Sequence, residues 1–85
     1  MSEYLVEVRV TPRQGLLDPQ GKAVHNALRS MEFEGVEEVR IGRLIRIRLA
    51  APSEAEARER ADAMCQKLLA NPVTEDYEIA LEVAR

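Results

Sequence analysis

Cysteine, histidine and aromatic residues are scarce in this sequence of 85 residues. It has one cysteine, Cys65, one histidine, His25, two tyrosines, one phenylalanine and no tryptophan. One cysteine cannot form a disulfide within the chain, and one histidine leaves no cluster with the spacing of a metal site. Few aromatic side chains are available to stack on bases, and a net charge of −3 lacks the basic excess of nucleic-acid-binding domains. We therefore expect no disulfide framework, no metal site and no nucleic-acid partner.

Long hydrophobic runs are also missing. No apolar stretch approaches the ~20 residues that span a bilayer, and residues 1–3 lead directly into a charged, alternating segment without a signal-peptide core. The sequence therefore predicts a cytoplasmic protein with no membrane partner. Its composition, 46% hydrophobic and 32% charged, is that of a globular domain. Because no linker, repeat or low-complexity segment divides the chain, residues 1–85 are expected to form a single domain.

The first third of the chain predicts one strand and one helix. Apolar and charged residues alternate over residues 4–10, which is the period of a half-buried strand. Asp18 is a good N-cap, and Pro19 suits the first helical position because no N–H is needed there. The apolar residues that follow recur at helical spacing, at Ala23, Val24, Ala27, Leu28 and Met31. We predict a helix that begins at Asp18 and ends near Gly35.

The rest of the chain predicts three strands and a second helix. Residues 39–41 and 45–49 alternate again, with Gly42 and Arg43 between them like a two-residue hairpin turn. Ser53 followed by Glu56 is a capping box, which opens a helix that ends before Asn71. Residues 77–83 alternate to form the last predicted strand.

The element order β-α-β-β-α-β predicts an α+β, ferredoxin-like sandwich in which two helices cover one face of an antiparallel sheet. The opposite face then carries charged residues from all four strands. Opposite charges on neighbouring strands stabilise a sheet without any ligand, so we interpret this face as a set of cross-strand pairs rather than an anion site. Its members are Glu7, Arg9, Glu38, Arg40, Arg46, Arg48, Glu78 and Glu82.

Candidate catalytic groups are isolated in the sequence. His25 has no acid and no serine or thiol close by, and it is interpreted as a surface or boundary histidine. Cys65 falls on the apolar stripe of the second helix and is expected to pack as a small hydrophobe. The "DPQG" stretch at residues 18–21 lacks the Lys-Ser/Thr ending of a phosphate loop. We expect no catalytic, cofactor-binding or metal-binding residue in this chain, which points to a binding or assembly role.

Three segments in this order, in a chain of this length, resemble one known family. They are "GLLDPQGKAVHNAL", "VEEVRIGRLIRI" and "MCQKLLANPVTEDYEI". Together they resemble PurS, the small subunit of phosphoribosylformylglycinamidine (FGAM) synthase, a glutamine-dependent C–N ligase of purine biosynthesis. The resemblance implies a PurS-like fold, and a non-catalytic subunit that forms dimers or tetramers. It also implies a bridge between a PurL-type synthetase and a PurQ-type glutaminase, which assists ammonia transfer. ATP with Mg and glutamine would be used by those partners.

The resemblance also marks candidate partner contacts. These are Asp18, Pro19, Gln20, Gly21, Lys22, Arg40, Gly42 and Arg43. Gly21 would let a partner's backbone approach closely, and Gln20 could hydrogen-bond across an interface. The alternative is that the fold itself requires this turn. Arg43 stands where the family usually has lysine, so the positive charge is kept but its geometry is not.

Two other functions fit the same fold class. One is a stand-alone ferredoxin-like dimer that senses a small ligand, which fold alone does not exclude. The other is an acylphosphatase-like enzyme, which would need an arginine near the first strand and an asparagine in the hairpin. The hairpin position offers Gly42 and Arg43 instead, so this function is disfavoured.

Overall fold

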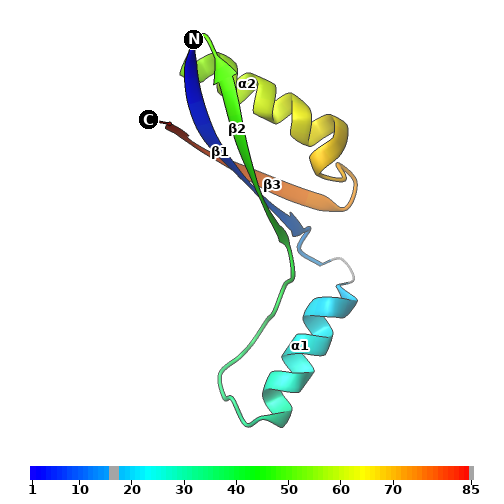
Figure 1. Cartoon of the computed structure of the whole chain (residues 1–85). Coiled ribbons are helices and arrows are strands. Elements are labelled where there is room, and N and C mark those ends of the chain that lie inside the picture. The colour runs from blue at the N-terminus through cyan, green and yellow to red at the C-terminus, as the bar shows by residue number, and fades with distance from the viewer. Residues whose placement is uncertain (16–17, 85) are drawn as a thin grey trace.

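The computed structural model describes residues 1–15 and 18–84, which form an antiparallel sheet and two helices (Figure 1). The elements in chain order are β1 (Ser2–Pro12), α1 (Pro19–Ser30), β2 (Arg43–Ala51), α2 (Glu54–Met64), the π-helical turn η1 (Cys65–Leu69) and β3 (Glu75–Val83). The described sheet has the order β2-β1-β3, and β1 pairs antiparallel with both neighbours. The predicted α+β class with an antiparallel sheet is confirmed.

The core lies between the sheet and α2. The even-numbered residues from Tyr4 to Val10 in β1 are buried, as the alternation predicts. Val8, which is fully buried, lies between Ile45 of β2 and Ile79 of β3 in the register. On the opposite side of the core, Ala57 and Ala61 of α2 are buried. Their small side chains let the helix backbone approach the sheet closely.

The second helical segment starts at the predicted cap and ends before Asn71 as predicted, but its last turn, η1, is wider than an α-helix. Ser53 is the N-cap, and its Oγ accepts a hydrogen bond from the N–H of Glu56 at 3.2 Å. Glu56 also pairs with Arg60 one turn later, at 2.9 Å. After Met64 the helix widens into η1, where the N–H of Ala70 reaches back five residues to the carbonyl of Cys65. The wider turn keeps Cys65 buried under the sheet.

The predicted strand at residues 39–41 and the hairpin at Gly42 and Arg43 are wrong for the structure of this chain. In the part that is described, residues 36–42 pair with no other strand, and Gly42 continues without a turn into β2. A Cβ at Gly42 would overlap the carbonyl oxygen of Val10, so the glycine lets this segment lie close against the backbone of β1. Residues 33–42, the return segment, therefore follow α1 back to the sheet in an extended conformation.

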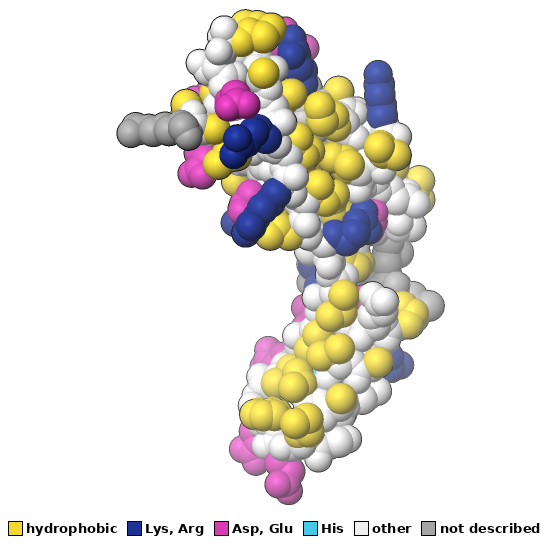
Figure 2. Space-filling model, in the orientation of Figure 1, with side chains coloured by type: hydrophobic (Ala, Val, Ile, Leu, Met, Phe, Trp, Pro, Cys, Tyr) yellow, Lys and Arg dark blue, Asp and Glu magenta, His cyan; other side chains and the backbone are white. Residues whose placement is uncertain are grey.

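The prediction that both helices cover the sheet is also wrong. Only α2 packs on the described strands, whereas α1 and the return segment form an arm beyond one end of the sheet (Figure 1). The radius of gyration is 16.4 Å, against about 12 Å for a compact domain of this length. Hydrophobic side chains are visible along the arm in Figure 2. The apolar stripe that predicted α1 is thus real, but within one copy it packs on no sheet.

Candidate functional site

Asp18 lies where the arm leaves the sheet, and its carboxylate holds two segments together. Oδ1 accepts a hydrogen bond from the N–H of Gly21 at 3.0 Å, and Oδ2 accepts one from the N–H of Ile41 at 3.0 Å. The bond from Gly21, followed by the bond from Ile41, lowers the pKa of Asp18 below its ordinary value. The predicted N-cap is confirmed. The same side chain also fastens the end of the return segment to the start of α1.

Gly21 is buried in the first turn of α1. A Cβ at this position would overlap the carbonyl oxygen of Val39 and the carboxylate of Asp18. We expected a partner's backbone to approach this glycine, but the backbone that does so is the chain's own return segment. The use of glycine at a helical position, where it is a poor helix former, therefore has a structural reason within this chain.

A third contact joins α1 to the return segment at His25. Its Nε2 lies 2.8 Å from the carbonyl oxygen of Val36, within hydrogen-bond distance. The ring is half-buried, which agrees with the interpretation of His25 as a boundary histidine. Together with the contacts of Asp18 and Gly21, this bond makes the arm one packed unit rather than a loose helix and a loose strand.

The place where the arm leaves the sheet, residues 18–22 with Arg40, is called the corner. Its exposed side chains are Pro19, Gln20, Lys22 and Arg40. The first three are exposed on the first turn of α1, and the N–H of Lys22 bonds to the carbonyl of Asp18 at 3.0 Å. Arg40 lies on the facing return segment, where its Nε is 4.0 Å from a carboxylate oxygen of Glu38. Lys22, Arg40 and Asp18 line a hollow of about 510 Å³ at the base of the arm. These side chains are available for contact with a partner.

Arg43 belongs to the sheet and not to the corner. Its guanidinium donates to both carboxylate oxygens of Glu75, at 2.8 and 3.0 Å, and to the carbonyl of Leu69 at 2.7 Å. The bond from Arg43, and then the N–H of Asn71, lower the pKa of Glu75, while Glu75 raises the pKa of Arg43. Arg43 thus joins β2, η1 and β3 across the end of β1. A lysine could not make this forked contact.

A cluster that the sequence analysis missed lies between α2 and β3. The hydroxyl of Tyr77 donates to Oδ1 of Asp62 at 2.5 Å, and Nε2 of Gln66 donates to Oδ2 of the same carboxylate at 2.9 Å. The bond to Asp62 raises the pKa of Tyr77. The spacing of Asp62 and Gln66 at i and i+4 was a signal for half of this cluster. The cluster fixes the C-terminal end of α2 on β3.

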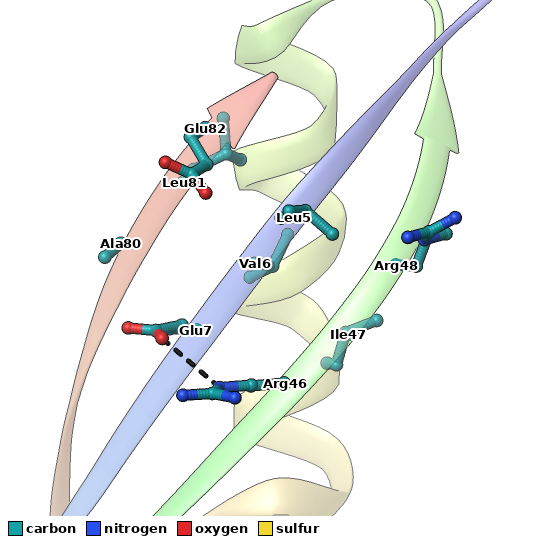
Figure 3. Close-up of a pocket in the computed structure, with 9 residues that line it drawn as sticks. All are labelled: Leu5, Val6, Glu7, Arg46, Ile47, Arg48, Ala80, Leu81 and Glu82. Carbon is teal, nitrogen blue, oxygen red and sulfur yellow. Dashed lines mark ion pairs between the residues drawn. The ribbon is translucent and has the colours of Figure 1, made fainter. Parts of the chain in front are cut away.

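The face of the sheet opposite α2, called the open face below, carries the expected charges from three strands. The prediction was wrong for Glu38 and Arg40, which lie on the return segment and not on a strand of this sheet. Glu7 of β1 lies 3.4 Å from Arg46 of β2 (Figure 3). It also lies 3.5 Å from Arg9 of its own strand. The predicted cross-strand pairing is therefore confirmed for Glu7 and Arg46. A shallow hollow of about 600 Å³ runs over this face, lined by side chains of all three strands.

The one thiol of the chain, which could act in catalysis, lies inside the fold and not at the surface. Cys65 is buried, and burial raises the pKa of its thiol. Within residues 1–15 and 18–84, no three His, Cys, Asp or Glu side chains are grouped to hold a metal ion. No helix in the same residues is long and apolar enough to cross a bilayer.

Comparison with known proteins decides the family. A family model described as phosphoribosylformylglycinamidine (FGAM) synthase, PurS, matches residues 5–83. The chain belongs to the PurS family. The PurS subunit of FGAM synthase from Synechocystis is 46% identical over 87% of this chain and 74% of its own length. The Bacillus subtilis PurS subunit is 42% identical over 93% of both chains.

Solved structures agree with the family and with the unusual arm. The crystal structure of Methanocaldococcus jannaschii PurS has a TM-score of 0.84 at 36% identity, and it covers 96% of this chain and 99% of that chain. A chain in the structure of PurLQS from Thermotoga maritima has a TM-score of 0.88 at 29% identity, with coverage of 96% and 100%. Scores this high over nearly the whole length mean that the elongated shape, arm included, is similar in these structures.

Proposed function

We propose that this chain is the small, non-catalytic subunit of FGAM synthase in purine biosynthesis, and that it bridges a PurL-type synthetase and a PurQ-type glutaminase. In this function the complex converts formylglycinamide ribonucleotide to the amidine, and the partner subunits use glutamine and ATP with Mg. Membership of the PurS family supports the assignment. The similarity to a chain of the Thermotoga maritima PurLQS structure supports the choice of partners.

The exposed arm is the observation that carries this proposal. A chain that acted alone would bury the apolar side of the arm, whereas Val24 of α1, and Met31 and Phe33 just after it, are 39%, 66% and 54% exposed. Asp18 and His25 hold the two segments of the arm together. A projection whose segments are bonded to each other and whose apolar side is exposed is suited to insertion between other chains.

Self-association through the arm is part of the proposal. The core face of the sheet has one helix where a ferredoxin-like sandwich has two, and Ile47, Leu49 and Ile79 on this face are only partly buried. The apolar side of α1 from a second copy would cover these side chains. β2 is an edge strand of the described sheet, and its free edge would accept the return segment of that copy as a fourth strand. Such an exchange restores the sandwich that the sequence predicts.

Reconstitution with the PurL-type and PurQ-type subunits tests the function. We expect glutamine-dependent synthesis of the amidine to require this chain, while ammonia-dependent synthesis by the large subunit proceeds without it. A pull-down in the presence of glutamine and nucleotide should recover all three chains. Equal rates of glutamine-dependent synthesis with and without the chain would show that the proposal is wrong.

Variants of the corner test which surface meets the partners. Gln20→Ala, Lys22→Glu and Arg40→Glu change exposed side chains of the corner, and Arg40→Glu also removes the ion pair with Glu38, at 4.0 Å. We expect each to weaken assembly so that more of the small subunit is needed for half-maximal synthesis, with full activity restored in excess. Glu59→Gln on the exposed side of α2 is the control and should leave the titration unchanged. Titration curves identical to wild type for all three corner variants would exclude the corner as a contact.

A further inference from the structure

Gly42 is the single residue that joins the base of the arm to β2. On one side of it, the N–H of Ile41 is bonded to Asp18 at the start of α1. On the other side, Arg43 opens β2 opposite Val10 of β1. Figure 1 shows the chain running from the arm into β2 without folding back. To close the arm over its own core face, the chain would have to reverse its direction at this junction.

The junction is too short for that reversal. The tightest common hairpins have loops of two residues, whereas one residue lies between Ile41 and Arg43. A loop that borrowed Arg43 would break its bonds to Glu75 and to the Leu69 carbonyl, and would end its pairing with Val10. With the arm and β2 as they are, the chain is one residue short of a hairpin.

The hydrophobic pattern on the two sides of the junction also disfavours a two-residue hairpin. The odd-numbered residues of β2 lie on the core face, because Ile45 pairs with the buried Val8. A loop made of residues 42–43 would pair Ile41 with Leu44, which lies on the open face. The apolar side of the return segment would then point away from the core. The pattern has the phase of one continuous strand.

Three-residue loops restore the phase, but the glycine is in the wrong place for them. Such loops have a positive φ at their third residue, which favours glycine there. The third residue is Arg43 in a loop of residues 41–43 and Leu44 in a loop of residues 42–44. Gly42 stands one or two positions too early, and each of these loops takes Arg43 out of β2.

The return segment keeps backbone groups that a second copy could use. Within residues 1–15 and 18–84, Glu38 and Arg40 form no backbone–backbone hydrogen bond, whereas the N–H of Ile41 is taken by Asp18. Backbone groups of alternate residues in an extended segment point to opposite edges. The edge that points away from α1 is therefore free to pair.

We propose that this register holds the arm open. The junction at Gly42 prevents the arm from closing over the core face of its own chain, and so leaves that face to the arm of a second copy. Short connections that cannot turn back favour the exchange of an element between copies. The choice of a second copy rests on the self-association proposed above, whereas the block on closure does not.

Insertion of one Asn between Ile41 and Gly42 tests the proposal. The Asn-Gly pair supplies a two-residue turn that pairs Ile41 with Arg43 in the correct phase. We expect a mass about half that of wild type in sedimentation equilibrium at the same concentration. As a monomer, the variant should have a radius of gyration of about 12 Å in X-ray scattering, against 16.4 Å for the open chain.

A second variant has Asn-Asp inserted at the same place. It forms a three-residue loop with Gly42 in third position, and it should behave in the same way. The matched control is one Asn inserted between Glu34 and Gly35, in the turn after α1. This control also creates an Asn-Gly pair but leaves the junction unchanged, so it should keep the mass and shape of wild type. Circular dichroism and urea unfolding show that each variant is folded.

Two outcomes would overturn the proposal. One is a folded junction variant that keeps the mass and radius of gyration of wild type. The other needs no variant: it is a wild-type monomer that sediments as a compact particle when the protein is diluted. A wild type that is monomeric and extended at every concentration would support the block on closure and contradict the exchange of arms, so the two proposals fail separately.

Discussion

The Oδ2 atom of Asp18 accepts a hydrogen bond from the N–H of Ile41, which lies 23 residues further along the chain, at 3.0 Å. The other oxygen of the same carboxylate caps α1 through Gly21. One side chain therefore fixes both ends of the arm relative to each other. A substitution at Asp18 that preserves only the helix cap will not preserve the arm, because two backbone donors need two acceptor atoms.

Asp18→Asn should destabilise the arm even though asparagine is as good an N-cap as aspartate. Asparagine has one acceptor oxygen, so either Gly21 or Ile41 loses its partner. We expect faster amide exchange at one of these two positions and a melting temperature several degrees lower, with a larger effect for Asp18→Ala. Hydrogen exchange followed by NMR measures both amides. Wild-type protection at both positions in Asp18→Asn would contradict this account.

Gly21→Ala should destabilise the fold, although alanine is the better helix former. The added Cβ overlaps the Val39 carbonyl oxygen, and displacing the return segment should cost about 1–3 kcal/mol. Gln20→Ala is the matched control, since Gln20 is exposed in the same turn, and it should be neutral or slightly stabilising. Urea unfolding of the two variants compares these effects. Equal stability of Gly21→Ala and wild type would mean that the return segment does not pack on this turn in solution.

The strands that pair in the structure could be predicted because their alternation records which face is buried. The same alternation misled at residues 39–41. An extended segment that packs on a helix and a strand that pairs in a sheet have the same local pattern, and the difference is made by Asp18, which takes the N–H of Ile41. Gly42 fits a hairpin turn as well as a close approach to the backbone of β1, so its presence could not decide between them.

The candidate site was only partly predictable for a similar reason. The cap at Asp18 is local, and its signal lies within four residues. The fork between Arg43 and Glu75 joins residues 32 apart on two strands that flank β1, and no periodicity records such a contact. The apolar stripe of α1 predicted the helix, but it could not predict the packing: within one copy Val24 and Met31 stay exposed.

Arg43→Lys should destabilise the chain by about 0.5–1 kcal/mol, a modest amount because the pair is partly exposed. An ammonium group cannot bond both oxygens of Glu75 and the Leu69 carbonyl in the same plane. Urea unfolding of Arg43→Lys, Glu75→Gln and the double variant forms a cycle that isolates the coupling. Additive effects would show that the fork contributes nothing to stability.

Stability should fall in acid partly through Glu75. Its pKa in the folded protein is lowered, first by Arg43 and then by the N–H of Asn71. The stabilisation is therefore complete above the ordinary pKa of glutamate, about 4.3, and is lost as the pH falls through the lower, folded value. Glu75→Gln should be less stable than wild type at pH 7 and should lose less stability between pH 5 and the acid limit. Parallel pH profiles for the two proteins would contradict the assignment.

Replacing the exposed apolar residues of the arm should separate self-association from folding. Met31→Ser/Phe33→Ser removes side chains that are 66% and 54% exposed in one copy, so the free energy of unfolding of the monomer should change little. If the arm covers the core face of a second copy, the same substitutions remove apolar burial at about 25 cal/mol per Å², enough to weaken the dimer by tenfold or more.

Leu68→Ser is the matched control, because Leu68 is 83% exposed on η1, away from the arm. Light scattering at a series of concentrations should show a smaller species for the arm variant alone. An arm variant that keeps the mass of wild type would exclude exchange of the arm.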